Sequence, residues 1–143
     1  MLTGRSFTTL VLIGLSLAAV SCSVPNLETA ECAAARNSVK RFYSLHFANQ
    51  VNPSDEYLKT RDGFLTEQLK NSLALVEEDE DYFTKTRDFP KAFRVGACSS
   101  NSQDRASLEV VLLWRDDVRN EQTEVQVNAI RSGGEWMIDS VEN

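Results

Sequence analysis

The period of the hydrophobic pattern changes near Pro90 and divides the chain into a helical part and a strand part. From Ala30 to about Gln50, apolar side chains recur every three or four residues, as on the buried face of a helix. The positions on this face are Cys32, Ala35, Val39, Phe42, Tyr43, His46 and Phe47. Thr29 precedes them and suits the N-cap position. The pattern predicts one long amphipathic helix.

Two shorter helical segments are expected before Pro90. Asn52-Pro53 ends the first helix, because proline disfavours helical geometry in the residue before it. Ser54 or Asp55 caps a short helix that ends at Gly63. A further amphipathic segment is predicted by the spacing of Phe64, Leu65, Leu69, Leu73 and Val76.

Beyond Pro90, apolar residues alternate with polar ones, which is the period of strands with one buried face. The four predicted inward sets are Phe93, Val95 and Ala97; Leu108, Val110, Leu112 and Trp114; Val125, Val127 and Ala129; and Trp136, Ile138 and Ser140. Gly133-Gly134 favours a tight hairpin turn between the last two. Helices followed by an antiparallel meander predict an α+β domain, with the helices packed on one face of the sheet.

The first twenty-one residues have the features of an export signal. Arg5 is followed by an apolar run over 7–20, which ends in the small residues Ala18, Ala19 and Ser21. This run is shorter than the roughly twenty apolar residues that span a bilayer. A cleaved secretory signal is therefore favoured over a permanent transmembrane helix.

Cys22 follows the signal directly, and Ala19-Val20-Ser21-Cys22 resembles the bacterial lipoprotein cleavage box, in which the cysteine is lipidated and becomes the new N-terminus. Ala19 replaces the usual leucine, so cleavage by an ordinary signal peptidase is the alternative. We expect a lipid anchor at Cys22, a tether over 22–29 and a single domain over 30–143. Several acyl chains would hold this domain at a membrane surface.

Cys32 and Cys98 remain as an even pair, which outside the cytoplasm indicates a disulfide. Structural zinc needs four ligands, and the sole histidine, His46, leaves the set one short. The sequence has no phosphate-binding glycine loop, nucleophile elbow or metal-spaced histidine cluster. We therefore expect no metal and no cofactor.

The formal charge is −6, and removal of residues 1–21, which carry Arg5 and no acid, makes it −7. Such a body repels nucleic acid, whose binding requires clustered Lys and Arg. Five consecutive acids, Glu77 to Asp81, are expected to form a solvated loop, because they lack the ligand spacing of a calcium loop.

Several segments together resemble an uncharacterised group of bacterial exported domains. They are the first helix with Val39, Phe42 and Tyr43, the segment from Phe64 to Thr66 followed by Leu69, the stretch from Tyr82 to Pro90, and the closing strand from Gly134 to Asp139. This group is similar to a branch of the nuclear transport factor two-like superfamily, the cystatin-like cone fold. The resemblance covers most of residues 31–142 and implies a curved sheet around helices with a cavity at its open end. The superfamily uses this shape for enzymes and for binding modules, so the resemblance supports the fold better than an activity.

Candidate pocket residues are His46, Tyr43, Tyr82 and Asp88. His46 lies on the predicted inward face, where it serves either as an acid or base or as a core-edge residue bonded to a carbonyl. Tyr43, Tyr57 and Tyr82, with Asp88 and Asp139, offer phenol and carboxylate groups, and their spacing singles out no pair. No position matches a catalytic pair of the superfamily, so no catalytic residue is assigned.

The leading hypothesis is an exported, non-enzymatic module that binds a small ligand or an envelope protein. A small acid–base enzyme of the dehydratase or isomerase type is the first alternative, and His46 about 3 Å from a carboxylate in an apolar pocket would favour it. A structural or assembly partner in the envelope is the second, and a large apolar patch on the sheet would favour that.

Overall fold

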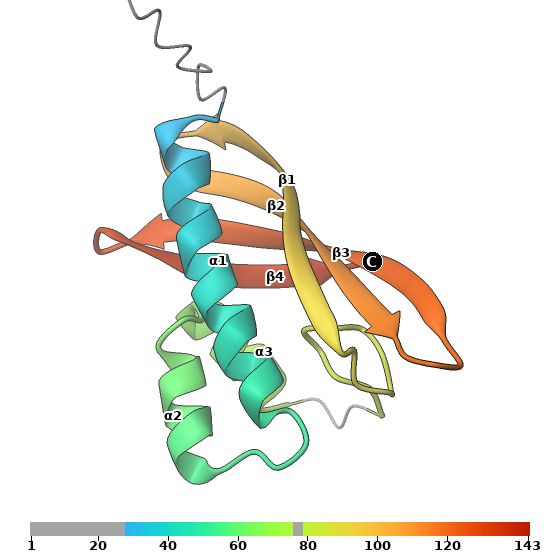
Figure 1. Ribbon diagram of the computed structural model, residues 1–143. Coiled ribbons are helices and arrows are strands. Elements are labelled where there is room, and N and C mark those ends of the chain that lie inside the picture. Colours follow the sequence, from blue (N-terminus) through green and yellow to red (C-terminus); the bar gives the residue numbers. More distant parts are fainter. Residues whose placement is uncertain (1–27, 76–78) are drawn as a thin grey trace, which may run out of the picture.

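The computed structural model describes residues 28–75 and 79–143, and shows three helices followed by four strands (Figure 1). Their bounds are α1 (Ala30–Asn49), α2 (Asp55–Asp62), α3 (Glu67–Leu73), β1 (Ala92–Ser102), β2 (Arg105–Arg115), β3 (Asn120–Ser132) and β4 (Glu135–Glu142). The strands form one antiparallel sheet in the order β1-β2-β3-β4. The predicted α+β class and the four-strand meander are confirmed. The expected signal segment, Cys22 and most of the tether lie outside the described residues.

Helix α1 lies along one face of the curved sheet, α2 packs against α1, and α3 contacts β4 (Figure 1). The core between α1 and the sheet contains Val39, Phe42, Tyr43, Leu108, Val110, Leu112, Val125, Val127 and Ile138, all at most 2% exposed. Each such side chain contributes roughly 1.5–3 kcal/mol of transfer free energy. The predicted inward faces of α1, β2 and β3 are confirmed.

A hydroxyl at each N-cap sets where the helices begin. Thr29 Oγ1 accepts from the Cys32 N–H, and Ser54 Oγ accepts from the Tyr57 N–H. Thr66 Oγ1 accepts from the Leu69 N–H. All three bonds have lengths of 3.1–3.2 Å. These bonds satisfy donors that have no partner inside the first helical turn.

The expected helix over Phe64 and Leu65 is wrong, because these residues pair with β4. The Ile138 N–H donates to the Phe64 carbonyl at 2.8 Å, and the Thr66 N–H donates to the Ile138 carbonyl at 3.0 Å. Leu65 is buried in the core, and α3 begins only after Thr66. Val76 lies outside the described residues.

Two β-bulges change which residues of the edge strands face the core. The register of β1 shifts between Val95 and Cys98, so Cys98 points inward and the expected Ala97 is exposed. In β4, Ile138 pairs with Ala129 while Ser140 pairs with Asn128, which leaves one extra residue. Val141 is therefore buried, and Ser140 bonds to Asn128 on the outer face. A strict alternation fails at both places because a bulge inserts one residue.

The hairpin at Gly133 and Gly134 is confirmed, with φ angles of 60° and 89°. Glycine adopts these positive angles without the steric cost of a Cβ atom. The turn joins β3 to β4 and fixes their register.

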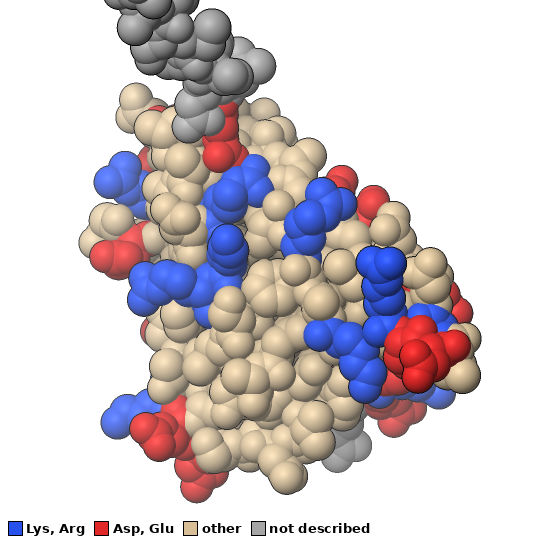
Figure 2. Space-filling model, viewed as in Figure 1, with Lys and Arg blue, Asp and Glu red and all other residues tan. Residues whose placement is uncertain are grey.

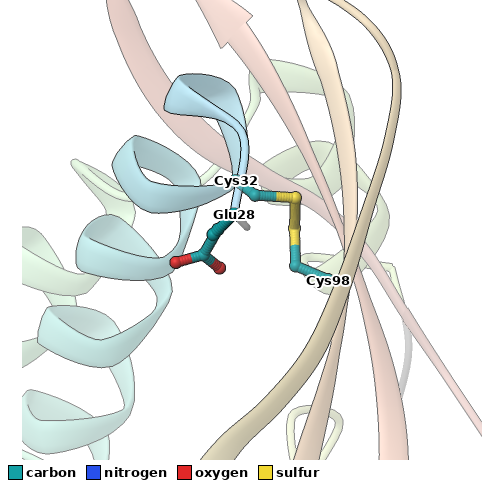
Figure 3. Close-up of side chains that lie close together, drawn as sticks. All are labelled: Glu28, Cys32 and Cys98. Atoms are coloured by element: carbon teal, nitrogen blue, oxygen red, sulfur yellow. A yellow bond between two sulfur atoms is a disulfide. The ribbon is translucent and has the colours of Figure 1, made fainter. Parts of the chain in front are cut away.

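The predicted disulfide is confirmed: Cys32 of α1 is bonded to Cys98 of β1, with the Cα atoms 5.9 Å apart (Figure 3). Glu28 lies beside it, but its carboxylate accepts from Arg36 Nε at 2.8 Å. Because the two sulfurs are bonded to each other, this group does not form a metal site. Arg36 also donates to the carbonyls of Val95 (3.0 Å) and Gly96 (2.7 Å), which ties α1 to the bulge of β1. Among the described residues, no helix combines the length and the hydropathy of a membrane span.

Candidate functional site

His46 is placed near the C-terminal end of α1 by the apolar stripe of that helix. Its ring is stacked on Phe42, with centroids 5.8 Å apart, and the Phe83 ring meets it edge-on at 5.3 Å. The residue is 3% exposed. Aromatic contacts therefore fix the plane of the imidazole.

Both ring nitrogens of His46 face a polar side chain from another element. Nδ1 lies 2.6 Å from the hydroxyl of Tyr57 in α2, and Nε2 lies 3.1 Å from Oδ2 of Asp81. The Asp81 contact has the distance of an ion pair without the alignment of a linear hydrogen bond. Three segments of the chain thus meet in one cluster, which we call the Tyr57–His46–Asp81 cluster.

The backbone around Asp81 directs its second oxygen toward the histidine. Oδ1 accepts from the N–H groups of Phe83 and Thr84, each at 2.9 Å, and from the Thr84 hydroxyl at 3.2 Å. The side chain of Asp81 is 22% exposed. The solvated loop expected over 77–81 is therefore wrong for Asp81, although Asp79 and Glu80 are exposed. Residues 77 and 78 lie outside the described residues.

Asp81 is the residue of this cluster that sequence reasoning missed. Its position at the end of an acidic run suggested solvation, whereas the threonine three residues later is typical of a local turn in which an aspartate accepts backbone N–H groups. That spacing was the available signal.

The charges in the cluster follow from burial and pairing. Burial alone would raise the pKa of Asp81, but the contact with His46 and the N–H groups of Thr84 and Phe83 outweigh it, so the pKa lies below its usual value. Burial raises the pKa of Tyr57 to about 12, with Arg61 opposing the rise. At neutral pH the cluster therefore contains a carboxylate and a neutral phenol.

These protonation states define what the cluster can do. In the neutral imidazole with its proton on Nε2, beside Asp81, the Tyr57 hydroxyl donates to Nδ1. In the doubly protonated ring, Nδ1 donates to Tyr57 instead, and the hydroxyl proton is then free for a ligand oxygen.

A cavity of about 400 Å³ lies next to the cluster. Its lining comes from α1, α2, α3, the residues that follow α1 and α3, and the segment from Glu80 to Phe83. It comprises His46, Gln50, Pro53, Tyr57, Leu58, Arg61, Asp62, Lys70, Leu73, Ala74, Glu80, Asp81, Tyr82 and Phe83. Leu58 and Leu73 supply apolar surface to the lining, while Arg61, Asp62, Lys70 and Glu80 add charged groups. The pocket therefore combines a buried polar end with a lining of apolar and charged side chains.

Two of the four predicted pocket residues line the cavity, and the other two do not. His46 and Tyr82 line the cavity. Tyr43 is fully buried behind it, where its hydroxyl donates to the Phe83 carbonyl at 2.7 Å, and burial raises its pKa. Asp88 lies outside the lining and is bonded to Arg119, which lowers the pKa of the carboxyl. Asp139 accepts from the Thr66 hydroxyl at 2.9 Å.

No family model matches the sequence, and no curated protein matches it significantly. Among solved structures, a protein of unknown function from Bacteroides thetaiotaomicron aligns with a TM-score of 0.55 at 18% identity, covering 76% of this chain and 88% of that chain. A "Putative NTF2-like transpeptidase" from Campylobacter jejuni aligns with a TM-score of 0.35 at 16% identity, covering 78% and 98%. The second score is too low to carry a structural argument. The chain shares its fold with the Bacteroides protein, and neither likeness assigns a function.

Proposed function

We propose that this chain is an exported, lipid-anchored module that binds a small molecule in the pocket beside the Tyr57–His46–Asp81 cluster. The disulfide supports export, because such bonds form and persist in oxidising compartments. The resemblance to the cone-fold superfamily supports a pocket at the open end. The lipid anchor is the expectation drawn from the sequence around Cys22.

The observation that carries this proposal is a buried polar cluster in the wall of a cavity whose lining also contains apolar side chains. Small-molecule sites are clefts of about 300–1,000 Å³ in which a few placed polar groups orient the ligand. Here Tyr57 and His46 supply such groups, and Leu58 and Leu73 supply apolar contact. The ligand that fits is a small amphipathic molecule with an oxygen-bearing polar end.

A neutral fluorescent probe, N-phenyl-1-naphthylamine, tests this pocket. We expect its fluorescence to rise on binding, and the affinity to fall several-fold in Leu58→Gln, because this change removes apolar contact from the lining. The matched control is Val118→Gln, which changes a 94% exposed side chain in the β2–β3 turn. Equal binding by both variants, or no binding by the folded wild type, would contradict the proposal.

The second candidate is a small acid–base enzyme that uses the same pocket. The 3.1 Å between His46 Nε2 and Asp81 Oδ2 favours it, because a carboxylate beside an imidazole is the arrangement by which proteins orient a general base. Tyr57 would then exchange a proton with a ligand oxygen through His46. The shielding of Nε2 from solvent is the reason that binding remains the first proposal.

Deuterium exchange separates the two candidates. The chain is incubated in D₂O with a panel of small ketones and hydroxyketones, and incorporation next to the carbonyl is followed by NMR. An enzyme should lose about 10²–10⁴-fold in rate in Tyr57→Phe. It should be unaffected by Tyr82→Phe, because Tyr82 belongs to the same lining but its hydroxyl makes only a long contact of 3.4 Å to the Val141 N–H. Background incorporation by the folded wild type leaves the binding module as the function.

The assembly alternative predicts an apolar patch on the sheet. In the described part of the chain, the exposed large apolar side chains are Val51, Leu58, Leu75, Phe89 and Val118, none of which lies in a strand. The structure therefore gives this alternative no specific support.

A further inference from the structure

Helix α1 carries a basic outer surface on an otherwise acidic protein. The chain has 21 acids and 15 bases, yet residues 32–54 contain no acid at all. The exposed side of α1 presents Lys40 and Arg41, and Arg94 of the neighbouring strand β1 is also exposed. In Figure 2, blue side chains lie over α1, while red ones lie mostly toward the edges of this face. We call Arg36, Lys40, Arg41 and Arg94 the basic strip.

Two shallow grooves join the members of the basic strip. One lies beside α1 and α2 and is lined by Asn37, Lys40, Arg41, Ser44, Leu45, Thr60 and Phe64. The other is lined by Arg36, Lys40, Phe93, Arg94 and Val95. Lys40 belongs to both, and neither lining contains an acid. The strip is therefore continuous across α1 and the edge of β1.

Three cations of the strip are available to an outside partner. Arg36 is paired with Glu28, but no ion pair between residues of the described ranges includes Lys40, Arg41 or Arg94. Arg41 lies over the Phe64 ring, 5.5 Å from its centroid, which holds its guanidinium at the groove. Leu45 and Phe64 give this groove an apolar floor between two positive charges.

We propose that the basic strip docks the domain onto an anionic phospholipid surface. This inference rests on the lipid anchor of the proposed function. An anchor at Cys22 leaves seven residues before α1, which extend at most about 25 Å, so one face of the domain meets the headgroups. Each Lys or Arg near an anionic surface contributes about a fivefold preference for it. The strip begins at Arg36 in the first half of α1, the helix that follows the tether, and docking by it orients the ligand pocket relative to the membrane.

The test uses the full chain, exported by a bacterial host, purified in detergent and reconstituted into vesicles. Phosphatidylcholine vesicles with or without about 30% phosphatidylglycerol are compared, which isolates headgroup charge. Lysine-reactive labelling followed by mass spectrometry then reports the accessibility of Lys40, with Lys59 of α2 as the internal reference. We expect labelling of Lys40 to fall about fivefold only in the anionic vesicles. High salt should restore it, because salt screens exposed charges.

A charge-reversed double variant, Arg41→Glu with Arg94→Glu, should abolish the protection of Lys40. The matched control, Arg115→Glu with Arg131→Glu, changes two other exposed arginines by the same charge and should retain it. Equal labelling of Lys40 in both kinds of vesicle, or protection that survives in the strip variant, overturns the docking proposal. The mass of the N-terminal peptide separately reports lipidation at Cys22, so failure of the anchor is distinguished from failure of the strip.

Discussion

At the scale of single residues, the site depends on two oxygens of one carboxylate that serve different partners. Oδ1 of Asp81 is occupied by backbone N–H groups, while Oδ2 lies 3.1 Å from His46. The same side chain therefore closes a local turn and orients the imidazole. Its replacement should disturb both.

Asp81→Asn should reduce the free energy of unfolding by about 1–3 kcal/mol at neutral pH, because it removes a charge-assisted contact from a buried histidine. The folded-state pKa of Asp81 is lowered, so its contribution is present above the unfolded pKa and is lost as pH falls through the folded pKa. The difference in denaturation free energy between wild type and variant, measured from pH 7 downward, should therefore shrink in acid. A difference independent of pH would show that the contact between Asp81 and His46 contributes nothing to this pH dependence.

Tyr57→Phe tests the other nitrogen of His46. The variant leaves Nδ1 buried without its hydroxyl partner, which costs about 1–3 kcal/mol. The pKa of Tyr57 is raised to about 12, so its contribution is fully present below pH 10, the ordinary value, and decreases as pH rises toward 12. Alkaline denaturation curves of the two proteins should converge over this window. Curves that stay parallel would indicate a tyrosine that titrates normally.

Prediction from sequence at this scale succeeded where the environment was apolar and failed where it was polar. His46 was identified because it shares a helical stripe with Phe42. Asp81 was missed because its role depends on a turn that brings its carboxylate against another element. A periodic pattern contains no information about such long-range polar contacts.

At the scale of elements, the segment from Phe64 to Thr66 connects a helix to the sheet. Its backbone pairs with β4, and Thr66 then begins α3. The helical spacing of Phe64 and Leu65 predicted a helix there, but their backbone pairs with Ile138 instead. Tertiary contacts commonly override a local sequence pattern in this way. The two bulges are shifts in the pairing between two strands, so the hydrophobic pattern of one strand does not reveal them.

Thr66→Ala should destabilise the protein by about 1–2 kcal/mol, because its hydroxyl caps α3 and donates to Asp139. The matched control is Thr60→Ala, which removes an exposed bond to the Glu56 carbonyl within α2. Chemical denaturation of the two variants should give a clear difference. Equal losses would show that the α3 cap contributes no more than a surface hydroxyl.

At the scale of the whole molecule, the disulfide fastens the first helix to the first strand. The bond closes a loop with a sequence separation of 66 residues, which in the chain-entropy model is worth about 4 kcal/mol. The double variant Cys32→Ser with Cys98→Ser should therefore unfold at markedly lower denaturant concentration. Reduction of the wild type should produce the same shift, and a midpoint unchanged by either treatment would contradict this prediction.

The fold class, the order of the elements and the disulfide were all predictable at this scale, because they follow from the change of period at Pro90 and from the cysteine count. The pocket was not, because it is built from side chains of four separate segments. Only their packing shows that Tyr57 and Asp81 flank the same histidine.

The pairing of residues 64–66 with β4 has a consequence for behaviour at high local density. At high protein concentration, an open strand edge can pair with a strand of another chain. The edge strand β4 is already paired at Ile138 with the backbone of Phe64 and Thr66. The other edge strand, β1, is interrupted by a bulge at which the carbonyls of Val95 and Gly96 accept hydrogen bonds from Arg36. Intermolecular strand addition, the first step toward fibrous aggregates, is thereby discouraged at both borders.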